Sequence, residues 1–141
     1  KKIILNPAPA QSLSNEILNG LYLITPNETE AEILTGINVH DESTASIAAG
    51  ALLKKGVQNV IITLGSKGAY FENKLENFSV AAPKVIAVDT TAAGDTFNAA
   101  IAVALAENKS WKDAIEFACL AASVSVTRMG AQSSVPYRDE L

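Results

Sequence analysis

The sequence predicts an α/β fold in which a mostly parallel sheet is flanked by helices. Short apolar runs without polar alternation, at residues 1–5, 21–25 and 60–65, take turns with segments of helical periodicity. Strands that helices cover on both faces are apolar along their whole length, which is typical of a parallel sheet. The runs at 69–73 and 76–81 are separated only by polar residues, so we expect them to form a small antiparallel pair.

The first elements have clear stop signals. The strand at 1–5 ends at NPAPA, where two prolines prevent both helix formation and ladder pairing. A short helix over 14–18 is expected to close at Gly20, and the strand at 21–25 follows it. The elements therefore begin to alternate within the first 25 residues.

The segment PNETEAEILTG, residues 26–36, predicts a helix with Pro26 at its first position and Gly36 at its end. Thr25 and Glu28 have the spacing of a capping box, so we expect Glu28 to serve the cap. The run at 43–56 predicts a further helix that stops at its final glycine.

The second half predicts one more strand and two helices. The apolar run VIAV, residues 85–88, reads as a strand, and the alanine-rich run after Gly94 reads as a buried central helix. Residues 110–130 predict the other helix, with Ser110 as its cap, Asp113 as the partner of that cap and a glycine at its stop.

Composition bounds the class of protein. With 141 residues, 48% of them hydrophobic and 18% charged, the chain can bury a core and is expected to form one globular domain. The net charge of −4 argues against nucleic-acid and membrane partners. No apolar run reaches the roughly 18 residues of a membrane span, so we expect a soluble, cytoplasmic protein. Cys119 is the single cysteine, which leaves no disulfide within the chain.

The start of the chain is itself informative. Its only methionine is Met129, and the sequence opens directly on an apolar run suited to a central strand. We therefore expect an N-terminal part to be absent. Such a truncation would leave an exposed apolar sheet edge, which tends to pair with another chain, so self-association is expected.

The motif DTTAAGDTFN, residues 89–98, carries the strongest chemical signal. It opens onto the helix after Gly94, and a helix N-terminus presents unpaired N–H groups and about half a positive charge, which attract anions. Gly94 has no side chain to keep a ligand from those amides. Asp95 would stand beside the anion, and the alternative is that Asp95 only caps the helix.

The turn TLGSKG, residues 63–68, follows a buried strand. Gly65 and Gly68 permit close backbone approach, and Lys67 would neutralise phosphate. A glycine-bounded turn with no ligand is the alternative. Neither GxxxxGK[ST] nor GxGxxG occurs, which disfavours the ordinary NTPase and dinucleotide-binding classes.

Two further pairs suit cations. Asn27 and Glu30 face the same way at a helix start and would reach a ligand or a Mg²⁺-bound water, unless they only decorate the helix. Asp89 and Thr91, with carbonyls from the loop after the last helix, would surround a cation with oxygen ligands. His40 is the only histidine, which disfavours Ser/His/Asp and zinc sites.

These polar signals share one position in the fold. Residues 25–30, 65–68 and 89–95 each follow a predicted strand, and ligands of α/β sheets bind at the carboxyl ends of strands. Their expected convergence favours a phosphate site over three unrelated turns.

In order and spacing, the motifs LNPAP, ITPNETEAE, TLGSKG, DTTAAGDTFN and VTRMGAQSSVP resemble the ribokinase branch of the phosphofructokinase-B sugar kinase family. The resemblance covers the whole chain but only about the C-terminal half of a complete member. It implies a ribokinase-like, Rossmann-like partial domain, with residues 1–141 as the nucleotide-binding and catalytic portion and the sugar-binding and lid half absent.

The resemblance also implies roles for individual residues. Asp95 would take the proton from the acceptor hydroxyl, and the amides of Ala93, Gly94 and Asp95 would form the anion hole. Asn27 would touch the nucleotide phosphates and Glu30 would organise Mg²⁺ through water. The nucleotide site would be lined by Thr63, Leu64, Gly65, Ser66, Lys67 and Gly68.

The resemblance also implies a K⁺ site, and the sequence departs from the family pattern at one position. The K⁺ ligands would come from Asp89, Thr91, Ser125, Arg128, Gly130 and Ser134, with Ser125, Arg128 and Gly130 contributing carbonyls. Cys119 stands beside the adenine where members often have a polar residue, which puts affinity or base preference in doubt.

The implied activity is ATP-dependent phosphorylation of D-ribose to D-ribose 5-phosphate, by an intact enzyme that we expect to be a homodimer. The fragment alone is expected to be inactive, because groups that orient the sugar are missing. The alternatives are a related kinase acting on fructose, 2-keto-3-deoxygluconate or a nucleoside, a nucleotide-binding module without catalysis, and a truncated product with no function of its own.

Overall fold

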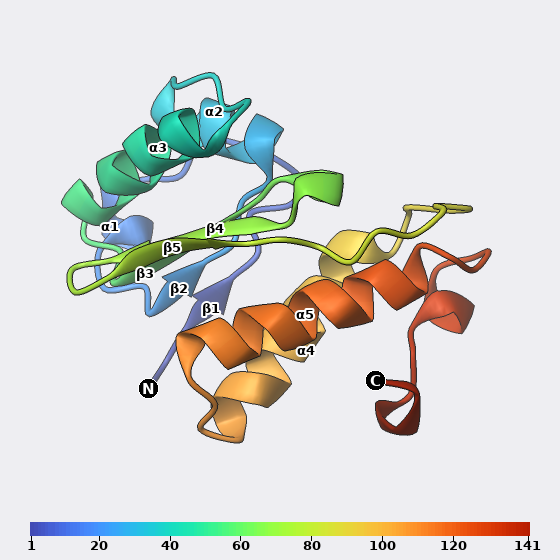
Figure 1. The fold of residues 1–141 in the computed structure, drawn as a ribbon. Helices are drawn as coiled ribbons and strands as arrows, with labels where there is room; N and C mark the ends of the chain where they lie inside the picture. Colours follow the sequence, from blue (N-terminus) through green and yellow to red (C-terminus); the bar gives the residue numbers. More distant parts are fainter. The chain divides into compact units, whose positions relative to one another are not determined.

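The computed structural model describes residues 1–141, and contacts divide them into two compact units. The first unit holds residues 1–65 and 69–79, and the second holds residues 66–68 and 80–141. Figure 1 shows the elements in chain order. No helix of the described residues is long and apolar enough to cross a membrane.

The sheet has five strands in the order β1-β2-β3-β4-β5. The elements β1 (Ile4–Leu5), β2 (Leu23–Ile24) and β3 (Asn59–Thr63) are parallel, with Ile4 opposite Leu23 and Leu23 opposite Asn59. The strand β4 (Ala69–Asn73) runs antiparallel to β3, and β5 (Asn77–Val80) lies beside β4. The predicted α/β class is confirmed, and β1 and β2 are shorter than their apolar runs.

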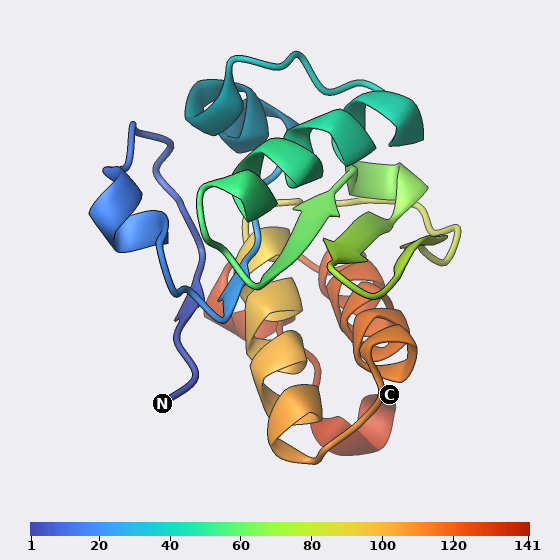
Figure 2. The same cartoon turned by 90° about the vertical axis from the view of Figure 1, so that its left-hand side faces the viewer.

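Three helices belong to the first unit: α1 (Asn15–Leu18), α2 (Glu28–Thr35) and α3 (Glu42–Lys54). Figures 1 and 2 show α2 and α3 on the same face of the sheet. Their apolar residues join strand residues in one core, because each helix has a buried stripe that must be covered. Members of this core include Leu18, Ile24, Ala45, Leu52, Val60 and Ile62.

The start of α2 differs from the prediction. Pro26 is not the first helical residue, because its carbonyl accepts a hydrogen bond from the Thr63 N–H at 2.9 Å and so remains in the parallel ladder. Asn27, in extended backbone, is the N-cap. The predicted box of Thr25 with Glu28 is wrong: the box is formed by Asn27 and Glu30, and the Thr25 hydroxyl donates to the Leu5 carbonyl.

The second unit is built on two long helices, α4 (Ala93–Ala106) and α5 (Trp111–Ser125), which pack against one another (Figure 2). Two short 3₁₀ helices follow, η2 (Gln132–Ser134) and η3 (Arg138–Glu140). The predicted cap of α5 is confirmed: the Ser110 hydroxyl accepts from the Asp113 N–H at 3.2 Å and donates to its carboxylate at 2.7 Å.

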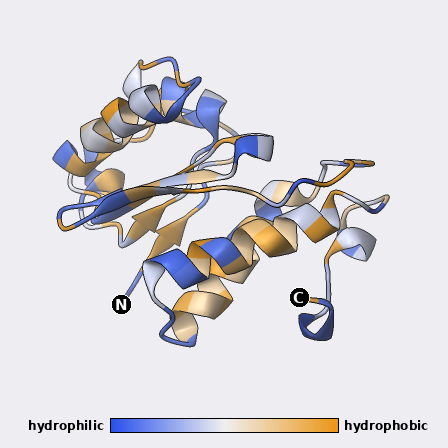
Figure 3. Cartoon of the chain, in the orientation of Figure 1, coloured by the Kyte–Doolittle hydropathy of each residue, from blue (hydrophilic) through white to orange (hydrophobic).

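The predicted strand at 85–88 is absent. Val85, Ile86 and Val88 are exposed by 45%, 88% and 56%, and Figure 3 shows this apolar stretch on a connecting loop. A strand needs a ladder partner, and no strand of the described residues pairs with this run. Instead, the N–H groups of Val88 and Asp89 both donate to the Val126 carbonyl, at 2.7 and 3.2 Å.

Candidate functional site

The mouth of α4 holds the predicted catalytic residue. The helix starts at Ala93, and the side chain of the N-cap residue Ala92 makes no hydrogen bond. Asp95 is therefore the third residue of the helix, and its carboxylate is exposed in the first turn. The alternative that Asp95 is the N-cap is wrong, because Ala92 is the N-cap. The Asp95 carboxylate therefore does not cap the helix.

Two N–H groups at this mouth have no acceptor in the chain. The Ala93 N–H donates to the Thr90 carbonyl at 3.2 Å, and the Thr96 N–H donates to the Ala92 carbonyl at 2.9 Å. The N–H groups of Gly94 and Asp95 lie between them and make no such bond. Together with the positive end of the helix dipole, they provide a place for an anion.

Gly94 keeps the space in front of these donors open. A Cβ built on Gly94 would meet no atom within 4 Å, and the residue does not have a positive φ. Neither packing nor backbone strain therefore requires glycine here. The open space admits a ligand to these backbone N–H groups, so the residues of this mouth fit a phosphoryl group.

Asp89 ties together the two loops of the predicted cation site. One carboxylate oxygen accepts from the Thr91 hydroxyl at 2.6 Å and the Thr91 N–H at 3.0 Å, and the other accepts from the Gly130 N–H at 3.0 Å. The hydrogen bonds from Thr91, followed by that from Gly130, hold the pKa of Asp89 below its ordinary value. The residue is therefore ionised at neutral pH.

The other predicted K⁺ ligands lie at the end of α5 and in the segment that follows it. The Ser125 carbonyl accepts from the Arg128 N–H at 3.1 Å, and the buried Ser134 hydroxyl donates to the Ala131 carbonyl at 2.8 Å. The carbonyls of Arg128 and Gly130 accept no hydrogen bond in the chain. One ionised carboxylate beside unused carbonyl oxygens fits an oxygen-ligated cation such as K⁺.

In the first unit, strand pairing brings Asn27, Glu30 and Thr63 together. Asn27 forms an isolated parallel bridge with Thr63. The Asn27 N–H donates to Glu30 Oε2, and Asn27 Oδ1 accepts from the Glu30 N–H, both at 2.9 Å. Glu30 is 7% exposed and its Oε1 has no hydrogen bond in the chain. We expected Glu28 to form the capping box and Glu30 to serve an ion. The expectation for Glu28 is wrong, because Glu30 forms the box.

The turn after β3 combines structural and open glycines. Gly68 has φ +106°, and a Cβ there would lie 1.9 Å from the Val80 carbonyl oxygen, so the fold requires glycine at this position. Gly65, at φ +55°, has no atom within 4 Å of an added Cβ. Leu64 is buried, whereas Ser66 and Lys67 are exposed and lie within η1 (Gly65–Lys67). For Gly68, the alternative that the glycine serves the turn and not a ligand is therefore sufficient.

Cys119 lies on α5 and is 4% exposed. Burial, followed by the charge of Glu116, raises the pKa of its thiol to about 11. The thiol is therefore protonated at neutral pH and is no nucleophile. Its predicted position beside an adenine remains a prediction.

Residues 1–138 match the family described as pfkB family carbohydrate kinase. The chain belongs to this family. This pfkB chain is 53% identical over 139 residues to a ribokinase of Haemophilus influenzae, covering 99% of this chain and 45% of that protein. The chain thus spans about half the length of the curated relatives that it matches.

Solved pfkB structures have the same fold. The crystal structure of a Thermotoga maritima ribokinase superposes with a TM-score of 0.91 at 49% identity, covering 99% of this chain and 47% of that one. An Arabidopsis thaliana ribokinase complexed with ribose and ATP has a TM-score of 0.93 at 38% identity, covering 98% and 45%. The resemblance drawn from the motifs is confirmed.

Sequence reasoning missed two features of this pfkB site. The capping role of Asn27 and Glu30 was available as a signal, because an Asn followed three residues later by Glu before an apolar run is a start signature. The bond between Asp89 and Gly130 left no local pattern, since 41 residues separate the two.

Proposed function

We propose that this chain supplies the phosphate, cation and base residues of a kinase that transfers the γ-phosphoryl group of ATP to the 5-hydroxyl of D-ribose. The observation that carries the proposal is the open mouth of α4, where two unpaired N–H groups stand beside the Asp95 carboxylate. Its support among relatives is a ribokinase that is 53% identical and a similar structure that holds ribose and ATP.

In the proposed reaction, Asp95 accepts the proton of the 5-hydroxyl as its oxygen bonds to the γ-phosphorus. The bond from that phosphorus to the bridging oxygen of ADP breaks, and ADP leaves with its electron pair. The N–H groups of Gly94 and Asp95 stabilise charge on the transferring group. Because the Ala93 N–H already donates to the Thr90 carbonyl, it contributes less to the proposed anion hole than the other two N–H groups.

The remaining predicted residues have supporting roles in this proposal. Asn27 and the turn at 63–68 hold the nucleotide, with Cys119 beside its adenine, and Glu30 would hold Mg²⁺ through water by its unbonded oxygen. Asp89, Thr91 and the segment at 125–134 would hold K⁺. Mg²⁺ would neutralise charge on the phosphates. K⁺ would fix the loop before α4.

Because the chain spans about half of its relatives, the activity is proposed for a protein that contains residues 1–141 together with a sugar-binding part. A nucleotide-binding module without catalysis is the second candidate for the isolated chain. The same coverage supports it, and titration calorimetry of the 141-residue chain with ATP and Mg²⁺ tests it.

The test of the kinase proposal is ADP formation by the intact protein with ATP, Mg²⁺ and K⁺. D-ribose is compared with fructose, 2-keto-3-deoxygluconate and nucleosides, and phosphorus NMR identifies the phosphorylated hydroxyl. We expect the highest kcat/KM with ribose and a 5-phosphate product. A higher kcat/KM with another acceptor assigns the protein to a different sugar kinase, and no sugar-dependent ADP contradicts the proposal.

A further inference from the structure

The C-terminal segment contacts the loop that carries the proposed cation ligands. Glu140, in η3, accepts two hydrogen bonds from the Arg128 guanidinium, with Oε1 at 2.5 Å from Nη2 and Oε2 at 3.3 Å from Nη1. Glu140 Oε2 also accepts a hydrogen bond from the Tyr137 N–H at 2.7 Å. Both oxygens of this carboxylate are therefore held by donors of the chain. Neither the site residues predicted from the sequence nor the proposed reaction uses Glu140.

This ion pair has the geometry in which a surface pair is effective. Most exposed ion pairs contribute little, because water screens the charges and two long side chains must be ordered. A bidentate pair between arginine and a carboxylate is an exception, because its two hydrogen bonds fix the orientation of both groups. The side chains of Arg128 and Glu140 are each 35% exposed. The pair therefore holds the Arg128 side chain against η3.

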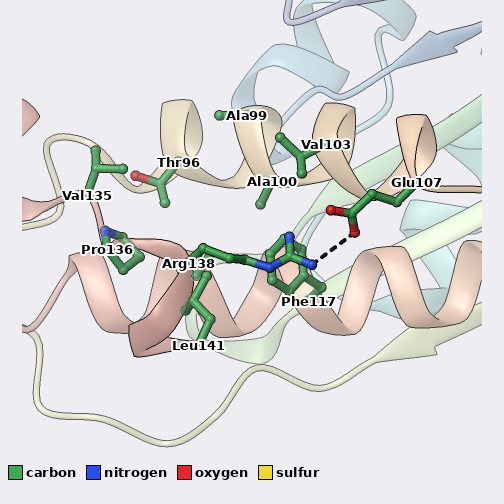
Figure 4. Close-up of a pocket in the computed structure, with 11 residues that line it drawn as sticks. Thr96, Ala99, Ala100, Val103, Glu107, Phe117, Val135, Pro136, Arg138 and Leu141 are labelled. Atoms are coloured by element: carbon green, nitrogen blue, oxygen red, sulfur yellow. Dashed lines mark hydrogen bonds and ion pairs between the residues drawn. The ribbon is translucent and has the colours of Figure 1, made fainter. Parts of the chain in front are cut away.

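The 3₁₀ helix η3 is itself anchored to the long helices of the second unit. The Arg138 guanidinium donates to the Glu107 carboxylate, at the end of α4, at 2.9 Å. It also stacks on the Phe117 ring of α5, with 4.7 Å from the guanidinium carbon to the ring centroid. Figure 4 shows these three side chains together. Because η3 rests on α4 and α5, Glu140 holds Arg128 from a fixed support.

Arg128 belongs to the loop of the proposed cation site, and carboxylates hold this loop at two points. Asp89 accepts from the Gly130 N–H at 3.0 Å, and Glu140 binds the Arg128 side chain. The carbonyls of Arg128 and Gly130 accept no hydrogen bond in the chain, so no donor orients them. Ordered carbonyls bind a cation more tightly, because less conformational entropy is lost when the ion binds.

We propose that Glu140 is a positioning residue for this site: by holding Arg128, it keeps the Arg128 and Gly130 carbonyls ordered for K⁺. This role rests on the proposed function, which assigns these carbonyls to K⁺. Glu140 acts through Arg128 and is not itself a ligand. Breaking the ion pair is therefore expected to weaken K⁺ binding while every proposed ligand atom stays in the chain.

The test uses the intact protein and has two readouts: amide hydrogen exchange at Gly130 without K⁺, and the K⁺ concentration that gives the half-maximal kinase rate. Tetramethylammonium replaces K⁺ to keep the ionic strength constant. Glu140→Gln removes the charge and the bidentate pair but keeps an acceptor oxygen. Exchange at Gly130 and the half-saturating K⁺ concentration should each rise about fivefold, as expected for loss of one well-formed ion pair. A lower Tm with both readouts unchanged would show a merely structural role and overturns the proposal.

Asp139→Asn is the matched control, because Asp139 also lies in η3 and is exposed. It removes the same charge without breaking the pair, so both readouts should stay within about twofold of the unmodified protein. Equal changes in Asp139→Asn and Glu140→Gln overturn the proposal, because net charge would then explain them.

A third variant tests whether Glu140 acts through Arg128. Arg128→Met removes the guanidinium and keeps the backbone carbonyl. Arg128→Met, Glu140→Gln and the double variant should all raise the half-saturating K⁺ concentration by about the same fivefold. Effects that multiply in the double variant overturn the proposal.

The unmodified protein separates this inference from the proposed function. If neither its rate nor its Gly130 exchange responds to K⁺, the proposed K⁺ site and the role of Glu140 both fail. If it responds to K⁺ and Glu140→Gln has the same K⁺ requirement, only the role of Glu140 fails.

Discussion

The carboxylate of Asp89 accepts a hydrogen bond from the backbone N–H of Gly130 at 3.0 Å, across 41 residues of sequence. This bond joins the loop that leads into α4 to the segment that follows α5. The N–H groups of Gly94 and Asp95 lie at the start of α4, so the bond helps to fix the loop that positions them.

Replacement of Asp89 by Asn should release Gly130. An amide that turns its oxygen to Thr91 presents its NH₂ group to the Gly130 N–H, and two donors do not bond. Amide hydrogen exchange at Gly130 is therefore expected to accelerate in Asp89→Asn. Asp139→Asn, an exposed variant with the same charge change, should leave it unchanged. Unchanged protection in Asp89→Asn would show that this hydrogen bond does not hold the loop.

The same bond predicts a pH dependence. The pKa of Asp89 is lowered in the folded chain, chiefly by hydrogen bonds from Thr91, so its stabilising contribution is full above the unfolded value of about 3.9. That contribution is lost as the pH falls through the lower folded value. The ordinary pKa of an Asp side chain is about 3.9. Carboxyl NMR titration should therefore place the titration midpoint of Asp89 below that value. A midpoint above it would be inconsistent with these contacts.

Glu30 has a capping role and a proposed ion role, and substitution separates them. Glu30→Ala removes the acceptor for the Asn27 N–H and should destabilise the fold by about 1 kcal/mol. Glu30→Gln keeps an acceptor oxygen but loses the charge. It should retain most of the stability in urea unfolding and require more Mg²⁺ for activity.

Glu28 is the matched control for this pair, since it lies in the same first turn without the capping bond. Glu28→Ala is expected to cost less stability than Glu30→Ala and to leave the Mg²⁺ requirement unchanged. If the two alanine variants are equally destabilised, the capping box does not stabilise α2.

Two glycines should respond oppositely to a methyl group. Gly68→Ala is expected to destabilise the fold by at least about 1–3 kcal/mol, because φ is +106° and the new Cβ would clash with the Val80 carbonyl. Gly94→Ala places its Cβ in open space inside a helix, so stability should be unchanged or slightly higher. Its kinase activity should nevertheless fall, because the methyl group stands where the phosphoryl group approaches. Full activity in Gly94→Ala would show that the N–H groups at the start of α4 do not form an anion hole.

The fold was predictable where local pattern and burial agree. The apolar residues of β3 and the Ser110 cap of α5 were both read correctly from the sequence, because each has its cause within a few residues. Residues 85–88 are apolar, as Val60, Ile61 and Ile62 of β3 are, but they are exposed and unpaired. A strand depends on its neighbours, and the sequence of the segment does not show whether a neighbour is present.

In the candidate site, too, local sequence does not show contacts with distant residues. Thr25 with Glu28 and Asn27 with Glu30 have equal spacing, so local reasoning allowed either box. The hydrogen bond from the Thr63 N–H to the Pro26 carbonyl decides between them, since it keeps the chain extended as far as Asn27. Asp95 and Gly94 were found from sequence because a glycine and an acid at a helix start are a local signal.

The most direct measurement is the sugar-dependent kcat of Asp95→Asn in the intact protein, compared with that of Asp139→Asn. Both substitutions remove one exposed carboxylate, but only Asp95 stands at the open mouth of α4. As a general base, Asp95 should contribute roughly 10²- to 10⁴-fold, so its variant should lose about that factor in kcat while Asp139→Asn keeps the rate of the unmodified enzyme. Equal rates in the two variants would contradict the assignment of Asp95 as the base.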